Sequence, residues 1–571
     1  MRTTLRRRTL LLAALSTLFT PIANAQQPAQ HYDVVIAGGS TAALAAAFSA
    51  AEEGANVALL EPTDWIGGQI TSSGVPAIDE AWHKVRRTDS SDPHASEGEL
   101  LLDVSAIARD PRNMTPFFRD ALAEIGCPGN GWVSRYCFEP REFLDRFLEP
   151  RERELAPKLT VFRETVVKRV ETEGRRITAI VAIQREPREG VAHAGYDRLP
   201  SQDLADWYSP TDSPRFTKTT LRFTAPVFVE ATEWGEVLAL ADAPLLQGVE
   251  VEDGSVDGDD TLGQSTTYGF VQKMHSEPVD DHPEIEPVEN LGLGAYHDRP
   301  NAWQLIWTYR RLRGEGREAS PGELSLQNWG YSIDRSEGGN DYPFGYLFLS
   351  RKRTAAQRDD WRGGVDLDVM AAAEKRALAW HDWFRHAAPD GVSPDQITLE
   401  GEVLGSGHGL SKLPYIRDTR RSVGVGGFLL NFEDLIGEIT PEGLSRATGT
   451  PFKDTVALGA YAADIHPLVG YQYPPHVHEN HPTLPFCLPL RSLTNDGYDN
   501  LLVAGKTMAQ TFVANSATRL QPIEWSSGTA AGVVAADLAE SGATTAQACE
   551  DYERLRKKVA RHTPVDWTLP E

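Results

Sequence analysis

Several features that define other protein classes are scarce or missing in this sequence. Only four of 571 residues are cysteine, and no two of them form the C-x-x-C spacing of a redox dithiol. Basic residues are outnumbered, with 56 Lys and Arg against 81 Asp and Glu and a formal net charge of −25. This acidity argues against nucleic acid or an anionic membrane surface as a partner. No internal repeat, coiled-coil heptad or low-complexity tract is present.

A long apolar run is also missing near the N-terminus, where the apolar stretch at residues 10–19 is too short to span a bilayer. Arginines precede this stretch, and Ala23-Asn-Ala25 follows it as a small-x-small cleavage site. The pattern predicts a signal peptide over residues 1–25, a periplasmic or secreted protein, and no membrane span in the mature chain. Arg7-Arg8 also fits a twin-arginine signal, so twin-arginine export and general secretion both stay open.

The most informative pattern that is present covers residues 33–61. A β-branched run (34–36) leads into the turn Gly38-Gly39-Ser40-Thr-Ala-Ala43, followed by an alanine-rich helix and a second apolar run that ends on Glu61. Strand, glycine turn, helix, strand and terminal acid form the pattern of a dinucleotide site. The turn lets a pyrophosphate approach the helix N-terminus, and Glu61 is placed to accept hydrogen bonds from a ribose.

This pattern departs from G-x-G-x-x-G/A at one position, because Ser40 stands where the second glycine is expected. A buried strand–helix–strand unit without a ligand therefore stays open as an alternative. The glycine pair Gly67-Gly68, shortly after Glu61, favours the dinucleotide interpretation because it brings the chain close to a bound cofactor.

Four stretches together resemble a known family, the FAD-dependent oxidoreductases of the glutathione-reductase-like superfamily, and in particular a secreted bacterial branch often labelled xanthan-lyase-like. These stretches are residues 38–74, residues 228–236, residues 413–421 with 464–467, and residues 500–532. The resemblance implies an α/β fold, in which a glutathione-reductase-like FAD-binding Rossmann domain (30–240 and 456–545) carries an inserted α+β substrate domain (241–455). A C-terminal tail helix is expected over 546–571. No second glycine turn follows a strand in 241–455, which argues against a separate NAD(P)H domain.

The cofactor implied by the resemblance is FAD, and the expected contacts lie on both ends of the chain. We expect the segment 526–532 to begin a helix whose free N–H groups face the flavin. Lys506 departs from the acidic residue that many relatives carry after Gly505. The residues expected to bind FAD are Gly38, Gly39, Ser40, Ala43, Glu61, Gly67, Gly68, Gln69, Thr71, Val167, Ala231, Thr232, Gly505, Gly528, Thr529 and Ala530.

The expected activity is removal of a hydride from a small organic substrate onto flavin N5, from a C–H next to oxygen or nitrogen or from a saturated C–C bond. His466 or Glu233 would take the accompanying proton, and Arg417 and Asn515 complete the residues expected to be catalytic. Oxygen or a periplasmic acceptor would re-oxidise the flavin. Two alternatives stay open: a flavoprotein with structural or lyase-like use of FAD, and a cofactor-free exported binding protein.

Three further interpretations concern single segments. Cys127 and Cys137 flank a turn-rich loop, and two interpretations stay open: a disulfide that closes the loop, and a redox-active pair that feeds the flavin. Residues 190–215 are interpreted as a surface excursion. His476, His478 and His481 lack the flanking carboxylate or cysteine of a metal site, so no metal is predicted.

Overall fold

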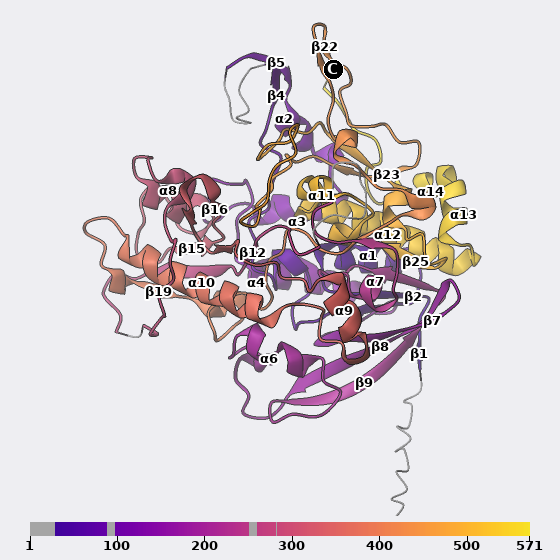
Figure 1. The fold of residues 1–571 in the computed structure, drawn as a ribbon, viewed down its shortest axis with the longest axis horizontal. Coiled ribbons are helices and arrows are strands. Elements are labelled where there is room, and N and C mark those ends of the chain that lie inside the picture. Colours follow the sequence, from indigo (N-terminus) through magenta and orange to yellow (C-terminus); the bar gives the residue numbers. More distant parts are fainter. Residues whose placement is uncertain (1–28, 88–96, 251–259, 281, 571) are drawn as a thin grey trace, which may run out of the picture.

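The computed structural model describes residues 29–87, 97–250, 260–280 and 282–570 (Figure 1). The predicted signal peptide, residues 1–25, lies outside these ranges. In the described ranges, no helix is both long enough and apolar enough to cross a membrane.

A parallel five-stranded sheet forms the centre of the first of two regions. Its strand order is β25 (Leu501–Val503), β10 (Val227–Glu230), β2 (Val34–Ala37), β3 (Val57–Leu60) and β6 (Leu159–Phe162). The β-branched and apolar residues of β2 and β3 are completely buried, as expected for parallel strands covered on both faces. Only β10 therefore separates β2, from the N-terminal part of the chain, from β25, which lies near the C-terminal end.

One face of this sheet is covered by two helices, α1 (Thr41–Glu52) and α12 (Gln521–Ser541), which pack on each other (Figure 1). Val34 and Ile36 point into this layer, whereas Val35 and Ala37 point to the opposite face. The two-residue alternation of a strand therefore supplies two separate cores from one short segment. Small side chains let the helices approach closely, and the Ser49 hydroxyl on α1 donates to the Thr529 carbonyl on α12 at 3.0 Å.

The opposite face of the sheet carries an antiparallel meander of three long strands. These are β7 (Thr165–Glu173), β8 (Arg176–Pro187) and β9 (Phe216–Thr224). The charged segment at 173–176 forms the tight turn between β7 and β8 that the sequence predicts, with Gly174 in the left-handed region at φ +56°. The parallel sheet thus lies between a helical layer and a β layer.

A second region, here called the cap, is built on its own aromatic core. Its antiparallel sheet has the order β14 (Arg311–Arg313), β15 (Leu324–Gln327), β13 (Phe270–Met274) and β19 (Ile397–Leu399). The helices α8 (Ala302–Tyr309) and α10 (Leu367–His386) bury Trp303, Trp307 and Trp380 against this region. In Figure 1 the cap elements lie on the left and the C-terminal helices on the right.

Residues 190–215 were predicted to be a surface excursion, and this prediction is wrong for residues 200–208. Helix α6 (Pro200–Trp207) lies there, and Leu204, Trp207 and Tyr208 are buried in the aromatic core. Helix α6 packs against α10 of the cap, where Glu374 accepts a hydrogen bond from the Ser201 amide at 2.8 Å. The tertiary contact with a helix far along the chain converts a polar-looking segment into core.

The remaining elements complete the layers around these units. At the C-terminus two short helices, α13 (Thr545–Glu550) and α14 (Tyr552–Val559), stand where one tail helix is expected. The other helices are α2 (Val104–Ala108), α3 (Pro116–Ile125), α4 (Pro140–Phe143), α5 (Glu149–Leu155), α7 (Glu236–Leu240), α9 (Arg351–Gln357) and α11 (Phe512–Thr518). The other strands are β1 (Gln30–His31), β4 (Val85–Arg87), β5 (Glu99–Leu102), β11 (Leu245–Leu246), β12 (Thr266–Thr267), β16 (Tyr331–Ser332), β17 (Glu337–Gly338), β18 (Asp341–Tyr342), β20 (Arg421–Ser422), β21 (Ile439–Thr440), β22 (Gly443–Leu444), β23 (Thr455–Gly459) and β24 (Phe486–Pro489).

Candidate functional site

The glycine turn between β2 and α1 is held against the end of β10. Gly38 has φ +112°, and a Cβ atom there would overlap the Ala231 carbonyl and the Thr232 amide. Only glycine fits both the backbone conformation and this close approach. The turn and the 231–232 segment, which are almost two hundred residues apart, therefore share one edge of the sheet, where parallel α/β folds bind ligands.

The backbone conformation and hydrogen bond of Ser40 explain why this position departs from the glycine pattern. Its backbone is extended, with φ −69° and ψ 164°, so glycine is not required there. Its hydroxyl accepts a hydrogen bond from the Ala43 amide at 3.0 Å and caps the first turn of α1. The serine thus belongs to the helix start, and Ala43 is buried in the layer between α1 and the sheet.

Glu61 lies at the end of β3 with one carboxylate oxygen in use and one free. Its Oε1 accepts hydrogen bonds from the Thr63 amide at 2.9 Å and from the Thr63 hydroxyl at 2.8 Å. Its Oε2 is buried without a hydrogen-bond partner among the described residues. Burial raises the pKa of Glu61 to about 8 despite these two bonds. A Cβ at Gly39 would overlap this carboxylate, so only glycine leaves room for the Glu61 side chain in this position.

The predicted glycine pair closes the turn from the other side. Gly67 and Gly68 have φ +115° and +60°, and a Cβ at Gly68 would lie 2.6 Å from the Thr41 amide nitrogen. The Thr41 hydroxyl donates to the Gly67 carbonyl at 2.9 Å. Gln69 donates from Nε2 to the Arg519 carbonyl at 3.2 Å, and the Thr71 hydroxyl donates to the Ile66 carbonyl at 2.7 Å. Gln69 and Thr71 therefore fix this loop and its link to the segment before α12.

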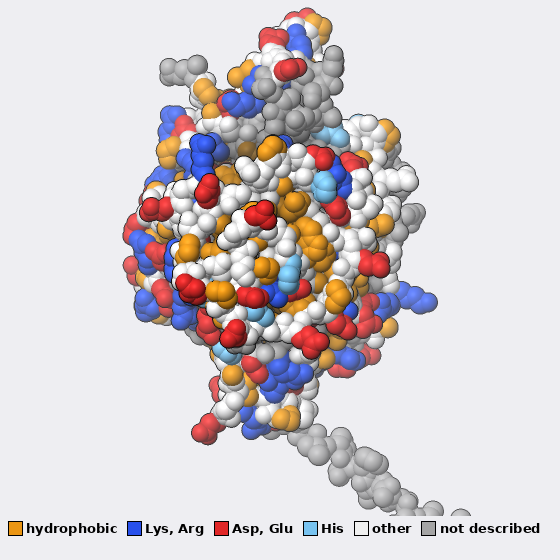
Figure 2. Space-filling view, turned by 90° about the vertical axis from the view of Figure 1, so that its left-hand side faces the viewer, with side chains coloured by type: hydrophobic (Ala, Val, Ile, Leu, Met, Phe, Trp, Pro, Cys, Tyr) orange, Lys and Arg blue, Asp and Glu red, His pale blue; other side chains and the backbone are white. Residues whose placement is uncertain are grey.

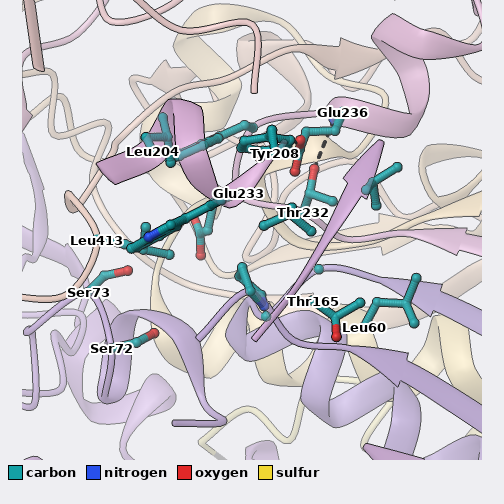
Figure 3. A pocket seen from close by; sticks show the side chains of 17 residues that line it. Leu60, Ser72, Ser73, Thr165, Leu204, Tyr208, Thr232, Glu233, Glu236 and Leu413 are labelled. Atoms are coloured by element: carbon teal, nitrogen blue, oxygen red, sulfur yellow. Dashed lines mark hydrogen bonds between the residues drawn. The ribbon is translucent and has the colours of Figure 1, made fainter. Parts of the chain in front are cut away.

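A cavity opens where these segments meet (Figure 3). Its walls combine the glycine turn with the ends of β3, β7 and β10, including Val167 and Thr232 as predicted. The cavity is lined by Gly38, Gly39, Leu60, Pro62, Ser72, Ser73, Thr165, Val166, Val167, Leu204, Trp207, Tyr208, Thr232, Glu233, Trp234, Glu236 and Leu413.

Several of these lining residues were missed from the sequence. Trp207 and Tyr208 come from α6, whose position depends on packing against the cap, and the sequence carries no local signal for it. Tyr208 donates to Glu236 at 2.7 Å, which fixes the ring at the cavity wall (Figure 3). Ser72 and Ser73 could have been inferred, because they follow the glycine pair directly in the same buried loop.

The three residues of α12 that were expected to contact FAD lie at a different place in the helix from the one predicted. Helix α12 begins at Gln521, so Gly528, Thr529 and Ala530 lie inside it and not at its start. A Cβ at Gly528 would overlap the Ala42 carbonyl of α1, and the Thr529 hydroxyl donates to the Trp525 carbonyl at 2.8 Å. The prediction of free N–H groups at this point is wrong, because the helix extends one and a half turns further toward the N-terminus. The glycine serves helix packing.

Gly505 and Lys506 follow β25 at the same edge of the sheet. Gly505 has φ +68°, and a Cβ there would lie 2.9 Å from that of Ala42. The Lys506 ammonium donates to Glu233 Oε2 at 2.8 Å and to Glu524 Oε1 at 2.7 Å. Although burial opposes it, this pair of carboxylates holds the pKa of Lys506 well above its usual range. Lys506 is therefore a buried cation between two acids.

His466 belongs to a charged network in the cap. Its Nδ1 lies 2.7 Å from Asp341 Oδ2, and its Nε2 lies 3.2 Å from Asp464 Oδ1. Burial and Arg417 oppose protonation, but the two carboxylates outweigh them and raise the pKa of His466. With both ring nitrogens engaged and the protonated form favoured, the predicted role as a general base is not supported. His466 instead links two carboxylates.

Arg417 and Asn515, also predicted to be catalytic, have their polar atoms occupied. Arg417 donates to Asp341 Oδ1 at 2.9 Å and to the Thr267 hydroxyl at 2.9 Å. Asn515 donates to the Arg417 carbonyl at 2.7 Å. Both are buried, so the structure gives them a supporting role. Of the four residues predicted to be catalytic, only Glu233 lines the cavity.

Arg519 connects this network to the cofactor side. It donates to the Tyr415 hydroxyl at 2.6 Å and to Asp464 Oδ2 at 3.0 Å. The Lys506 ammonium lies 5.9 Å from the centre of the Tyr415 ring. A continuous chain of contacts thus runs from the end of β25 to Asp341 in the cap.

The cysteines and histidines singled out from the sequence lie elsewhere. All four cysteines are free thiols in the structure. Cys127 contacts Cys137 and donates to the Gly131 carbonyl at 3.7 Å. His478 and His481 stack on each other, and within the described ranges no cluster of three His, Cys, Asp or Glu side chains could hold a metal ion.

The fold and the glycine-lined cavity define a Rossmann-type dinucleotide-binding protein. A family model described as FAD dependent oxidoreductase matches residues 33–196 and 214–559. This match covers most of the chain, and the protein belongs to the FAD-dependent oxidoreductase family. Its cofactor is FAD. The unmatched residues 197–213 contain α6, the helix that contributes Trp207 and Tyr208 to the cavity. No curated protein matches the chain.

Among solved structures, the chain is similar to a p-nitrophenol 4-monooxygenase, PnpA, of Pseudomonas putida, with 10% identity, TM-score 0.33, and coverage of 94% of this chain and 88% of that chain. It is also similar to THI4 of Thermovibrio ammonificans, with 16% identity, TM-score 0.22, and coverage of 38% and 67%. A third is a flavin-containing monooxygenase of Stenotrophomonas maltophilia, with 18% identity and TM-score 0.16. The alignment covers 35% of this chain and 38% of that chain. These likenesses carry no argument about activity.

The residues present fit FAD. The free Oε2 of Glu61 offers an acceptor to a ribose, and Gly38 and Gly39 form a cradle that any side chain would fill. Val167 and Trp207 provide apolar surface for a flat base on the same cavity wall. When bound, FAD supplies a ring that accepts hydride at N5.

Proposed function

We propose that this protein is an exported oxidoreductase that removes a hydride from a small organic substrate, from a C–H next to oxygen or nitrogen or from a saturated C–C bond. The observation that supports this proposal most is that one chain segment, residues 413–417, runs from the wall of the cofactor cavity into the charged network of the cap. Leu413 lines the cavity, and the same segment continues through Tyr415 to Arg417 in the charged network. The cap is thus the part of the chain that would bind and orient a substrate.

An exposed apolar patch borders the network on the cap side. Phe344 and Val469 are 45% and 53% exposed, and Phe344 contacts Tyr331 with ring centres 5.5 Å apart. A Cβ at Gly330, next to Tyr331, would lie 3.3 Å from His466 Cε1. Figure 2 shows that hydrophobic side chains gather at the centre of the face turned toward the viewer. We propose the patch as the substrate entrance, because an organic molecule gains free energy on apolar surface there.

The chain's own charged groups have a defined part in this proposal. Asp341, Asp464 and His466 form a hydrogen-bonded row in which the two carboxylates raise the pKa of the imidazole ring. Arg417 and Arg519 neutralise the outer oxygens of the two carboxylates. We propose that this row keeps the substrate-facing wall rigid, so that the substrate is held in one orientation and water is excluded.

The test is a screen of the purified protein loaded with FAD. Alcohols, amines and saturated acyl compounds are added without oxygen, and the visible flavin absorption is followed. We expect bleaching by members of one of these classes and recovery of the absorption when oxygen is admitted. The Phe344→Ala variant should raise KM for that substrate with little change in kcat, with the exposed Leu100→Ala as control. Flavin that no compound of the three classes bleaches contradicts this proposal.

The proposal also includes export of the protein from the cytoplasm. The N-terminal arginines, apolar stretch and Ala23-Asn-Ala25 support secretion to the periplasm or beyond, with oxygen or a periplasmic acceptor as oxidant and with neither nucleic acid nor a membrane as partner. Fractionation of producing cells tests this. We expect the mature form in the periplasm or medium, and replacing Arg7 and Arg8 by lysine should block export by the twin-arginine route but not by general secretion.

A further inference from the structure

Three buried oxygen atoms near the end of β25 have no hydrogen-bond partner in the part of the chain that the structure describes. They are Glu233 Oε1, Glu524 Oε2 and Gln69 Oε1. Glu233 and Glu524 each give their other oxygen to the ammonium of Lys506, at 2.8 and 2.7 Å. Gln69 uses its amide nitrogen on the Arg519 carbonyl. The two carboxylates therefore present more acceptor oxygens than the Lys506 ammonium and the Gln69 amide satisfy.

The charge count agrees with this excess. One ammonium faces two carboxylates, and the side chains of Lys506 and Glu524 are 1% and 0% exposed. A single buried ion pair would already be neutral, so a second carboxylate adds a desolvation cost without a further cation. Burial raises the pKa of Glu524 to about 7, which shows how poorly the protein alone compensates the second charge. Added hydrogen-bond donors would stabilise the charged form of both carboxylates in this arrangement.

The position of Glu233 and Glu524 indicates which chemical groups could donate hydrogen bonds to their free oxygens. Glu233 lines the cofactor cavity directly after Thr232, whose amide lies against the glycine turn. A phosphate is excluded from the cluster because it would add negative charge to two carboxylates. Hydroxyl groups fit, because they are neutral and donate to carboxylates in strong, charge-assisted hydrogen bonds. In FAD the segment next to the pyrophosphate is the ribityl chain, which carries hydroxyl groups.

We propose that Glu233 and Glu524, positioned by Lys506, bind the ribityl hydroxyls of FAD. Glu233 follows the end of β10 and Glu524 lies in the first turn of α12, so the two acceptors come from separate elements that meet at Lys506. Lys506 is a positioning residue: it holds one oxygen of each carboxylate so that the other faces the cofactor. The proposal rests on FAD as cofactor and is independent of which substrate the enzyme oxidises.

The experiment compares FAD with analogues that lack one ribityl hydroxyl, by measuring Kd on the apoprotein through flavin fluorescence. The wild type should bind at least one deoxy analogue about 10- to 100-fold more weakly than FAD, as expected for a lost hydrogen bond to a charged group. In Glu233→Met this discrimination should vanish, because the acceptor is gone. Glu233→Gln, which keeps an acceptor oxygen, should restore part of it. Both single carboxylate variants leave Lys506 in a neutral pair, so both should fold.

Two further variants separate positioning from folding. Lys506→Met should weaken FAD binding and abolish the discrimination, whereas Lys506→Arg should retain most of both. Asp454→Asn, a buried carboxylate that pairs with Arg491 at 2.9 Å and does not line the cavity, should leave both unchanged. Equal Kd values for FAD and every deoxy analogue in the wild type overturn the proposal while leaving FAD as cofactor. Equal losses for FAD and the analogues in Glu233→Met also overturn it. A Glu233→Met variant that binds a hydroxyl-bearing substrate more weakly but binds FAD as the wild type does also overturns the proposal.

Discussion

At the scale of single residues, the departures from the family pattern have physical explanations. Ser40 replaces a glycine at a position where the backbone needs no glycine, and it caps α1 instead. Lys506 stands where the family resemblance leads us to expect an acid, and its ammonium donates to two carboxylates, Glu233 and Glu524. Neither explanation is available from the sequence, because φ at Ser40 and the distance from Lys506 to Glu524 exist only in the folded chain. Ser40 was predicted to bind the cofactor and stays a prediction, whereas Lys506 was noted from the sequence only as a departure from the family pattern.

Glu61 makes a residue-scale prediction about pH. Its pKa of about 8 exceeds that of an unfolded-chain glutamate, so the folded apoprotein binds the proton more tightly than the unfolded chain. The free energy of unfolding of the apoprotein should therefore fall as pH rises from about 5 to 8, by up to about 4 kcal/mol from this group. Denaturant unfolding at several pH values measures this.

In Glu61→Gln the same pH series should be flatter, because the titrating group is gone. The exposed Glu186→Gln serves as control and should keep the wild-type slope. The same Glu61→Gln protein should bind FAD more weakly by about 1–3 kcal/mol, since the amide replaces a full acceptor. A pH dependence identical in the two variants would contradict the role of Glu61.

At the scale of elements, the strands were easier to predict than the helix ends. Residues 34–36 and 501–504 are apolar runs with turn residues behind them, and both are buried parallel strands. The start of α12 was misplaced, because Gln521-Pro522 looks like loop in isolation. Proline is well tolerated in the first helical turn, and the helix extends back to it because Leu520 and Ile523 are buried against the core.

Gly528 tests whether this part of α12 serves packing or cofactor contact. A Cβ there overlaps the Ala42 carbonyl, so Gly528→Ala must push α12 away from α1. We expect a loss of about 2–4 kcal/mol in the free energy of unfolding, measured on the apoprotein by denaturant. The exposed Glu540→Ala near the end of α12 is the control and should have little effect. A Gly528→Ala protein of normal stability that no longer binds FAD would instead support the contact predicted from the sequence.

The loop between Cys127 and Cys137 makes a prediction about thiol reactivity. The Cys137 thiol hydrogen-bonds to Cys127 and lowers the pKa of Cys127 to about 7, although burial opposes this. Cys137 is buried, and the same contact raises its pKa. Iodoacetamide at pH 7 should therefore modify Cys127 first, as read by peptide mass spectrometry.

In Cys137→Ala the alkylation of Cys127 at pH 7 should slow about tenfold, because its pKa returns toward that of an ordinary thiol. Cys487→Ala, which removes a remote buried thiol, should not change the rate. A pair that resists alkylation until it is reduced would show that the protein carries a disulfide here.

At the scale of the whole molecule, the cavity is assembled from segments that span most of the chain. The glycine turn, the start of β7, the segment after β10, α6 and Leu413 all contribute walls. Loading with FAD should therefore slow amide hydrogen exchange at residues 38–43, 165–167 and 231–236 together. Mass-spectrometric exchange with and without FAD measures this, and α14 serves as an internal control that should not change. Protection confined to one of these segments would contradict a shared site.

The sequence by itself determined the dinucleotide unit of this protein. Strand, glycine turn, helix and acid lie within residues 33–61, and local interactions among neighbours decide such a unit. Only the tertiary structure decided the partners of His466, the burial of Trp207 and the position of Gly528 inside α12. Each of these depends on a contact with a residue far along the chain. Periodicity and spacing report neighbours in sequence, whereas pKa, burial and helix ends at these positions follow from neighbours in space.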